Sequence, residues 1–357
     1  MLNRVLVCRC WAASQTSRAV DKVDILVKVV RTLLGDIPPG EMGITDCHEH
    51  LIRSGGPEIA ESQDYLLNDV DKAVQEFDLF VQSGGKAVVA MDPIGCGRDV
   101  AAMLEVARRV SGHILLTTGF HRGELYDNRH HWVMTCSVDQ VAEMLIAEIE
   151  EGLDLHSYNG PIVERVPAKA GLIKAGTSYL KVTEFERRAL QAAALAQSAT
   201  GAPIVTHTGG GTMALEQVEI LRGHGADVSK VIVGHMHRNP DPVYNRRVLA
   251  TGANLGYDTC RFKYYSENFL VSLLLDLVKA GYQRQIVLGH DAGTRGYQKA
   301  WGAGVGLDYL LTQFVPRLRS EGMPEDAIDD ILVNNPARVF AIEDKSSTCA
   351  EEAVHSV

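Results

Sequence analysis

The sequence lacks several features that mark secreted, membrane-spanning or nucleotide-binding proteins. It has seven cysteines in 357 residues, an odd number, and none of them forms a CxxC pair. This argues against a disulfide framework and fits reduced thiols in a cytoplasmic protein. The apolar part of the N-terminal segment is too short for a membrane span. Neither GxGxxG nor GxxxxGK[ST] follows the first predicted strand, so the usual nucleotide-binding signatures are missing.

The charge balance narrows the choice of partners. The net charge is −10, with acidic and basic residues interspersed. Such a surface opposes nucleic acids and anionic membranes and favours a small neutral or zwitterionic substrate. Hydrophobic residues make up 46% of the chain, which is ample for a large core. The length is within the range of one barrel domain with insertions.

Both ends of the chain differ in composition from the middle. The first twenty residues contain three arginines and no acidic residue. We predict that residues 1–22 are a disordered or mis-assigned extension, although a weak organelle-targeting signal also fits. Residues 344–357 are polar and follow the last periodic helix, so we predict a flexible tail. The domain itself is predicted to span residues 23–343.

Eight short apolar runs alternate with amphipathic segments along this domain, without an internal sequence repeat. Strand and helix alternation repeated eight times predicts an α/β fold, a closed parallel (β/α)8 barrel of the TIM type, rather than an open doubly wound sheet. The runs cover residues 44–50, 86–92, 113–120, 170–176, 203–208, 230–236, 248–258 and 285–292. Clear helical spacing occurs in residues 64–84, 141–153, 182–201 and 266–285.

Two segments outside this alternation have predicted roles at the ends of the barrel. The stretch before the first strand, residues 20–43, contains an alternating run followed by two prolines. We expect a short β-hairpin that covers the lower mouth. Residues 294–306, TRGYQKAWGAGVG, are rich in glycine and aromatic side chains. They are the natural candidate for a mobile lid over the upper mouth.

Polar side chains stand at the downstream ends of several predicted strands. In such a barrel these ends meet on one face, where the catalytic site is built. His48 and His50 are two residues apart, so on a strand both imidazoles face the same way, whereas Cys47 and Glu49 are expected to face the other way. Two inward imidazoles at a barrel mouth have few neighbours that could form hydrogen bonds with their ring nitrogens, which favours metal ligation.

His207, His235 and Asp291 follow three later strands. Taken singly, each histidine is more often a hydrogen-bonded core or surface residue, but adjacent strands bring both to the same rim. Asp291 could cap the following helix, or remain ionised beside a divalent cation. His237 is two residues from His235 and is an alternative ligand or a donor to one.

Lys174 is unusual among these residues because an ammonium facing cations would be repelled. The lysine must therefore have a lowered pKa, act as a Schiff-base nucleophile, or be converted to an anion. Reaction with carbon dioxide gives a carbamate whose two oxygens can bridge two metal ions. A lysine that extends out of a strand end into solvent is the plain structural alternative.

This set of residues resembles the phosphotriesterase family of the amidohydrolase superfamily, within it the phosphotriesterase-related branch. The family's first motif, Gly-x-Thr-x-x-His-x-His, is similar to residues 43–50, and the resemblance extends from Val30 to Ile342. It implies a carboxylated Lys174 that bridges two divalent cations, commonly Zn²⁺, together with a hydroxide. It assigns His48, His50 and Asp291 to the more buried cation, and His207 and His235 to the more exposed one.

The resemblance also implies an activity and an assembly. The bridging hydroxide would attack a C=O or P=O bond, Asp291 would accept the proton, and the protein would be a homodimer. Polar loops favour a carboxylic ester, lactone or N-acyl amide as substrate, with phosphotriester hydrolysis at most a side activity. The candidate substrate contacts are His121, Arg122, Tyr126, Tyr257 and Arg261. Lactone-hydrolysing relatives usually carry a tyrosine at the end of the third strand and an arginine in the loop after the seventh, and the third strand here ends without that tyrosine.

Three other functions remain open from the sequence. The protein could be a phosphotriester hydrolase proper, or a lyase that forms a Schiff base at Lys174. It could also bind a lipophilic small molecule without catalysis and keep the metal site only for structure.

Overall fold

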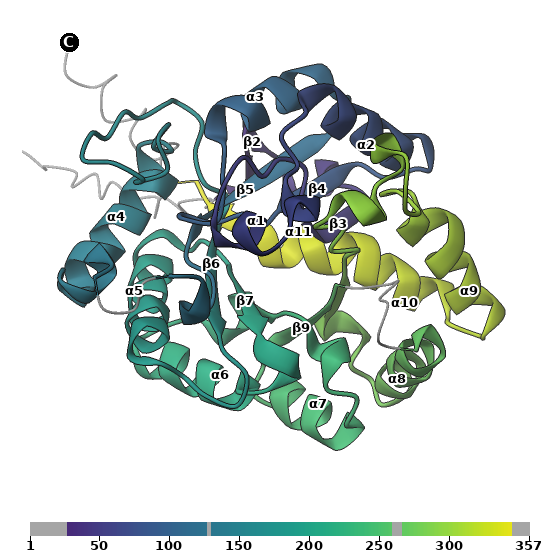
Figure 1. Ribbon diagram of the computed structural model, residues 1–357. Helices are drawn as coiled ribbons and strands as arrows, with labels where there is room; N and C mark the ends of the chain where they lie inside the picture. Colours follow the sequence, from purple (N-terminus) through teal and green to yellow (C-terminus); the bar gives the residue numbers. More distant parts are fainter. Residues whose placement is uncertain (1–26, 127–129, 259–265, 345–357) are drawn as a thin grey trace, which may run out of the picture. The chain divides into compact units, whose positions relative to one another are not determined.

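Eight parallel strands run in chain order around a nearly closed barrel, with helices outside them (Figure 1). The computed structural model describes residues 27–126, 130–258 and 266–344. Each strand lies in or overlaps one of the predicted apolar runs, so the predicted fold is confirmed. The strands are β3 (Thr45–Glu49), β4 (Ala87–Ala90), β5 (His113–Gly119), β6 (Leu172–Thr177), β7 (Ile204–Thr208), β8 (Val231–Val233), β9 (Asn254–Tyr257) and β10 (Ile286–Leu288).

The predictions for residues 1–22 and for Arg261 lie outside the described residues, as does the predicted tail, residues 344–357, apart from its first residue. Residues 28–344 form one compact unit. Within the ranges that the structure covers, every helix is too short or too polar to cross a membrane.

The longer helices cover the outer face of the barrel. Their apolar faces pack on the outward side chains of the strands and bury one large cluster that includes Phe77, Phe80, Leu145 and Leu274. The outer helices are α2 (Val70–Gln82), α3 (Val100–Arg109), α4 (Val138–Glu150), α5 (Glu184–Thr200), α6 (Ala214–Gly223), α7 (Pro242–Leu249), α8 (Glu267–Lys279), α9 (Val315–Ser320) and α10 (Glu325–Asp329).

Local sequence signals set the starts of several of these helices. The Asp69 and Asp99 carboxylates accept hydrogen bonds from backbone N–H groups in the first turns of α2 and α3. Ser137 and Thr183 form capping boxes with the residues three positions later, at the starts of α4 and α5. These caps satisfy N–H groups that have no partner inside a helix.

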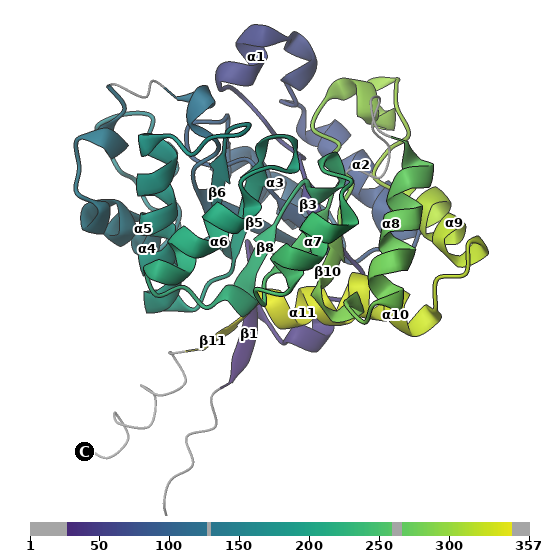
Figure 2. The ribbon, with the colours of Figure 1, turned by 90° about the horizontal axis from the view of Figure 1, so that it is seen from below.

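A small antiparallel sheet closes one end of the barrel, which confirms the predicted N-terminal hairpin. It contains β1 (Lys28–Thr32), β2 (Gly35–Ile37) and β11 (Ala341–Glu343), in the order β11-β1-β2. Figure 2 shows β1, β11 and α11 (Asn335–Phe340) at this end and α1 (Pro57–Glu61) at the other. Val30 and Phe340 join the inward side chains of the strands in a second apolar cluster. The bottom of the barrel is therefore filled, and only the opposite end is free to hold a site.

The first and last strands meet through side chains rather than through a ladder of backbone bonds. Asp46 Oδ1 accepts hydrogen bonds from the backbone N–H groups of His48 and His290, at 3.1 and 3.2 Å. Glu49 Oε2 accepts from those of His50 and Ala292, at 3.1 and 3.0 Å. Both carboxylates are fully buried. We call this junction between β3 and the residues after β10 the barrel seam.

The segment predicted to be a lid is fastened to the barrel at several points. The buried Glu76 carboxylate on α2 accepts hydrogen bonds from the backbone N–H groups of Ala300 and Leu307, at 2.6 and 3.0 Å. Gln298 Nε2 donates to the carbonyls of His50 and Ala292, at 3.0 and 2.9 Å. The loop after β10 is thus held against the residues that carry the candidate site.

Candidate metal centre at the carboxyl ends of the strands

A pocket of about 190 Å³ opens at the carboxyl ends of the strands. Drug-sized ligands occupy pockets of about 300 Å³ or more, so this one fits a small metabolite. The lining combines imidazoles, guanidiniums, carboxylates and a few neutral groups: His48, His50, Arg53, Glu58, Tyr65, His121, Arg122, His207, His235, Arg238, Asp291, Gly293, Thr294 and Tyr297.

A bulge in β3 turns His48 and His50 into the site. The pairing of β3 with β4 shifts between Asp46 and Glu49. An advance of three residues along β3 there matches an advance of two residues along β4. The extra residue re-aims the side chains that follow it. Cys47 consequently packs in the interior cluster with Val89 and Leu115. The expectation that Cys47 faces away from the barrel interior was wrong, because regular alternation does not hold across a bulge.

Asp291 brings a carboxylate to these two histidines. Its Oδ1 lies 3.2 Å from His50 Nε2 and 3.9 Å from His48 Nε2. The backbone has a φ of 58°, and the N–H donates to the His48 carbonyl at 2.9 Å. Burial alone would raise the pKa of Asp291, but His50, His48 and His235 hold it well below its usual value. The carboxylate is therefore ionised at neutral pH.

His207 and His235 form the other half of the ring of imidazoles. Their ring centroids are 4.5 Å apart, and those of His235 and His48 are 4.9 Å apart. Burial lowers the pKa of His235 to about 3. Burial and the neighbouring His121 keep the pKa of His207 well below its usual value. Both rings are neutral, as metal ligation requires, and Nδ1 of His207 has no hydrogen-bond partner among the described residues.

Asp258, which our reading of the sequence gave no role, lies between the two halves. Its Oδ1 is 2.6 Å from His235 Nδ1, and its Oδ2 is 2.9 Å from His48 Nδ1. Although burial raises the pKa of Asp258, His235 and His48 keep it well below its ordinary value. His237 is less central: its Nδ1 lies 3.7 Å from Asp258 Oδ1, and it does not line the pocket.

Asp92, after β4, has a similar relation to His50. Its Oδ2 lies 2.9 Å from His50 Nδ1, and its Oδ1 accepts from Arg53 Nε at 2.7 Å. The Arg53 NH2 group is also 2.8 Å from His50 Nδ1. Burial and Arg53 lower the pKa of His50, but Asp92 and Asp291 raise it, and the pKa is raised overall.

Lys174, on β6, is 1% exposed. Its ammonium makes no hydrogen bond or ion pair with any residue in the described ranges. Burial lowers its pKa to about 8. The Lys174 charge in turn lowers the pKa of His48 and His121, second only to burial. Lys174 therefore points toward the imidazoles and not into solvent.

The mouth of the pocket carries some of the predicted substrate contacts. His121 and Arg122 both line it, and the His121 ring lies 4.4 Å from that of His207. Arg122 NH1 is 3.5 Å from His207 Nε2. Arg238, which we did not single out, lies with its NH2 3.4 Å from Asp291 Oδ2.

Two other predicted contacts lie elsewhere. The Tyr257 hydroxyl donates to Asn245 Oδ1 at 2.8 Å, and its ring is fully buried. The Tyr126 hydroxyl donates to the Ile94 carbonyl at 2.7 Å, and its ring stacks on Phe185. Neither tyrosine lines the pocket.

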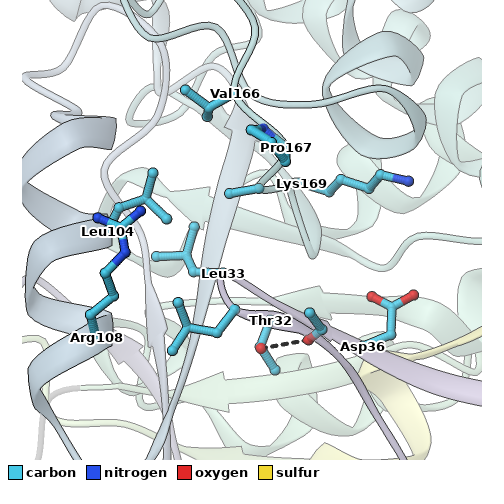
Figure 3. Close-up of a pocket in the computed structure, with 11 residues that line it drawn as sticks. Thr32, Leu33, Asp36, Leu104, Arg108, Val166, Pro167 and Lys169 are labelled. Carbon is cyan, nitrogen blue, oxygen red and sulfur yellow. Dashed lines mark hydrogen bonds between the residues drawn. The ribbon is translucent and has the colours of Figure 1, made fainter.

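A larger pocket, of about 560 Å³, lies beside the β1–β2 hairpin (Figure 3). Its walls come from Leu33, Leu104, Arg108, Val166 and Lys169, among others. It contains no histidine or cysteine and no group of carboxylates, so it offers no chemistry comparable with that of the smaller pocket.

The donors of the smaller pocket fit divalent cations. His48, His235 and Asp291 each offer a ligand atom, and these atoms lie within 4.8 Å of one another. Neutral imidazoles and an ionised carboxylate are the ligands that Zn²⁺ takes in catalytic sites. His207 Nδ1 also has no hydrogen-bond partner among the described residues, whereas most buried polar groups have one.

Comparison with known proteins shows the family to which the chain belongs. The model of the phosphotriesterase family matches residues 28–340. A phospho-furanose lactonase of Mycoplasmopsis synoviae is 44% identical, covering 89% of this chain and 93% of its own. The lactonase Lmo2620 of Listeria monocytogenes has a similar structure, with a TM-score of 0.82, 32% identity, and coverage of 88% of this chain and 100% of its own.

A more distant relative hydrolyses a different bond. An N-acetyltaurine hydrolase of Danio rerio is 27% identical, covering 87% of this chain and 97% of its own. The relatives thus share hydrolysis but differ in the group that they cleave. The chain described here belongs to the phosphotriesterase family, a family of metal-dependent hydrolases, and is itself a hydrolase.

Proposed function

We propose that the protein is a binuclear metal-dependent lactonase that opens a small lactone carrying a phosphate or a similar anion. The observation that carries the proposal is the convergence of the His48 and His50 Nε2 atoms on Asp291 Oδ1, at 3.9 and 3.2 Å. The three side chains meet there at distances that one cation would span. The 44% identity to a phospho-furanose lactonase supports the choice of substrate.

The ligand assignment is the one that the family resemblance implies. His48, His50 and Asp291 would hold one cation, and His207 and His235 the other. Lys174, carboxylated by carbon dioxide, would lie between them and remove the repulsion that a buried ammonium would cause. When bound, Zn²⁺ or a similar ion lowers the pKa of water and polarises a carbonyl oxygen.

Residues of the chain then have separate tasks. Asp291, ionised despite its burial, accepts the proton that the attacking water loses. Arg238, 3.4 Å from the Asp291 Oδ2 atom, keeps that carboxylate oriented. His121 and Arg122, at the pocket mouth, contact the substrate.

Charge and size favour a small anionic substrate. Three guanidiniums, those of Arg53, Arg122 and Arg238, line a pocket of only about 190 Å³, where Arg53 also pairs with Asp92 and Arg238 with Asp291. Guanidinium forms strong paired hydrogen bonds to phosphate. A sugar phosphate lactone meets both conditions, whereas an aryl phosphotriester is bulky and uncharged.

A substrate panel tests the proposal. The metal-loaded enzyme is assayed with five-membered lactones of sugar phosphates, the same lactones without phosphate, N-acetyltaurine, and an aryl phosphotriester. We expect the phosphorylated lactones to give the highest kcat/KM, and activity to disappear on chelation and return with Zn²⁺. Preference for N-acetyltaurine would instead assign the amidase activity of the distant relative, and turnover that survives chelation would exclude a metal-dependent reaction.

A further inference from the structure

Two buried aspartates touch the candidate metal ligands without facing the pocket. We propose that Asp258 and Asp92 are positioning residues that fix which nitrogen of each histidine faces the metal centre. We further infer that they act unequally: Asp258 supports both cation positions, and Asp92 supports only one. The proposal rests on the proposed binuclear function and concerns how the protein prepares its ligands.

Asp258 acts on two imidazoles at once. Its two oxygens lie 2.6 Å from His235 Nδ1 and 2.9 Å from His48 Nδ1. The His235 contact is a hydrogen bond, whereas the His48 contact is an ion-pair distance without hydrogen-bond geometry. An ionised carboxylate only accepts hydrogen bonds, so its approach favours the proton on Nδ1 of each ring. The lone pair of each neutral ring is then on Nε2, the atom that His48 directs toward Asp291. Asp258 thus sets both rings in the ligating tautomer before any cation arrives.

The position of Asp258 is itself held by the backbone. Its Oδ2 accepts the His235 backbone N–H at 3.1 Å, and the side chain is 2% exposed. His235 has a φ of 58°, a left-handed conformation that is uncommon for residues other than glycine. The carboxylate therefore fixes both the backbone and the ring of one ligand.

The two histidines held by Asp258 belong to different halves of the centre. His48 shares the Asp291 carboxylate with His50, whereas the His235 ring lies 4.5 Å from that of His207. The Asp258 carboxylate thus contacts one proposed ligand of each cation. Loss of Asp258 should weaken both cation positions.

Among the candidate ligands, Asp92 contacts His50 alone. Its Oδ2 is 2.9 Å from His50 Nδ1, but the Arg53 NH2 group is 2.8 Å from the same atom. Guanidinium can only donate, so it favours the tautomer in which Nδ1 is bare and the proton is on Nε2. That tautomer cannot bind a cation through Nε2. Asp291 Oδ1, 3.2 Å from His50 Nε2, favours the same Nε2–H tautomer while no cation is present, and Asp92 is the group that opposes both.

Asparagine substitutions expose the difference between the two carboxylates. In Asp258→Asn, the amide oxygen can accept from only one ring, and the amide nitrogen donates to the other, which moves that proton to Nε2. In Asp92→Asn, the same exchange is confined to His50. The expected losses of cation affinity are about 10- to 100-fold at each affected position.

The test measures Zn²⁺ content and affinity rather than turnover. Purified wild type and variants are stripped with a chelator, titrated with Zn²⁺ by calorimetry, and analysed for bound metal by mass spectrometry. We expect two ions in the wild type, both weakened in Asp258→Asn, and one of two weakened in Asp92→Asn. Asp154→Asn is the matched control, because Asp154 is also fully buried and accepts two backbone hydrogen bonds, at 2.7 and 2.8 Å, away from the centre.

A second measurement does not depend on the variants folding. Long-range ¹H–¹⁵N spectra of the metal-free wild type report the tautomer of each histidine, and we expect His48 and His235 to carry the proton on Nδ1. Protons on Nε2 would overturn the proposal, as would unchanged Zn²⁺ affinities in both variants. Equal loss of both ions in Asp92→Asn would overturn the inequality. A wild type that binds no divalent ion would instead overturn the proposed function.

Discussion

The backbone N–H of Asp291 donates to the carbonyl of His48 at 2.9 Å. This bond joins the first and last strands of the barrel at the point where their side chains converge. The geometry of the candidate metal centre therefore depends on closure of the barrel seam. The buried carboxylates of Asp46 and Glu49 also join these strands, because they accept hydrogen bonds from the backbone N–H groups of His290 and Ala292.

Removal of a seam carboxylate should lower stability. In Glu49→Ala, the buried N–H groups of His50 and Ala292 lose their acceptor. We expect a loss of about 3 kcal/mol in the free energy of unfolding, since each unsatisfied buried group costs about 1 to 3 kcal/mol. Urea denaturation measures it. The control is Glu143→Ala, at an exposed position on α4, and an equal effect of the two variants would contradict this role for Glu49.

Two replacements of Lys174 should show whether the site needs an anion at this position. Lys174→Arg cannot form a carbamate, so bound Zn²⁺ should fall below one ion per chain and activity should be lost. Lys174→Glu restores an anion and should recover part of the metal content. Metal analysis and ¹³C spectra of protein incubated with labelled bicarbonate provide the measurements. Full Zn²⁺ content in Lys174→Arg would show that the lysine is no ligand.

The pH dependence of reconstitution follows from the same side chain. The folded-state pKa of Lys174 is lowered from 10.5 to about 8 by burial. The unfolded chain thus binds more protons between these values, and the metal-free protein should gain stability as pH rises from about 8 to about 10.5. The fraction of Lys174 in the neutral amine form, which reacts with carbon dioxide, also increases as the pH rises.

Recovery of activity should therefore be faster at high pH. With Zn²⁺ and dissolved CO₂ held constant, we expect reconstitution of the stripped enzyme to be roughly 20-fold faster at pH 8.5 than at pH 6.5, from the neutral fraction of a group with that pKa. The initial rate of activity recovery measures it. Lys174→Glu needs no carbon dioxide, and its reconstitution should not respond to CO₂. A wild type equally indifferent to CO₂ would contradict the carbamate.

Anion recognition should depend on Arg122. Arg122→Leu removes a guanidinium from the pocket mouth, and a hydrogen bond to a charged group is worth about 1.5 to 3 kcal/mol. We expect KM for a phosphorylated lactone to rise about 10- to 100-fold, with little change for the lactone without phosphate. Arg187→Leu, on the exposed face of α5, is the control. A uniform effect on both lactones would argue for a role of Arg122 in folding or in metal binding.

The sequence predicts the barrel well because alternation of strands and helices is a local pattern. It also places His48, His50, His207, His235 and Asp291 on one rim, since the carboxyl ends of parallel strands share a face. Asp92 ends a predicted strand in the same way and could have been recognised by the same signal.

The remaining features depend on contacts between distant parts of the chain. Asp258 meets His235 and also His48, which is 210 positions earlier in the chain. The bulge in β3 leaves no mark in the composition of the segment, so the direction of Cys47 was misjudged. Tyr257 and Asp258 are neighbours on one strand and face opposite ways. That alternation could have shown that Tyr257 turns toward α7, where it meets Asn245.

The seam also bears on how the protein matures in the cell. Asp291 is near the end of the domain, so a ribosome must finish almost all of it before the acidic ligand can reach the first histidine pair. Nascent chains released early would contain four of the imidazoles yet lack the carboxylate that completes the set. The full ligand set of the proposed centre can therefore assemble only after the last strand of the barrel has joined the first.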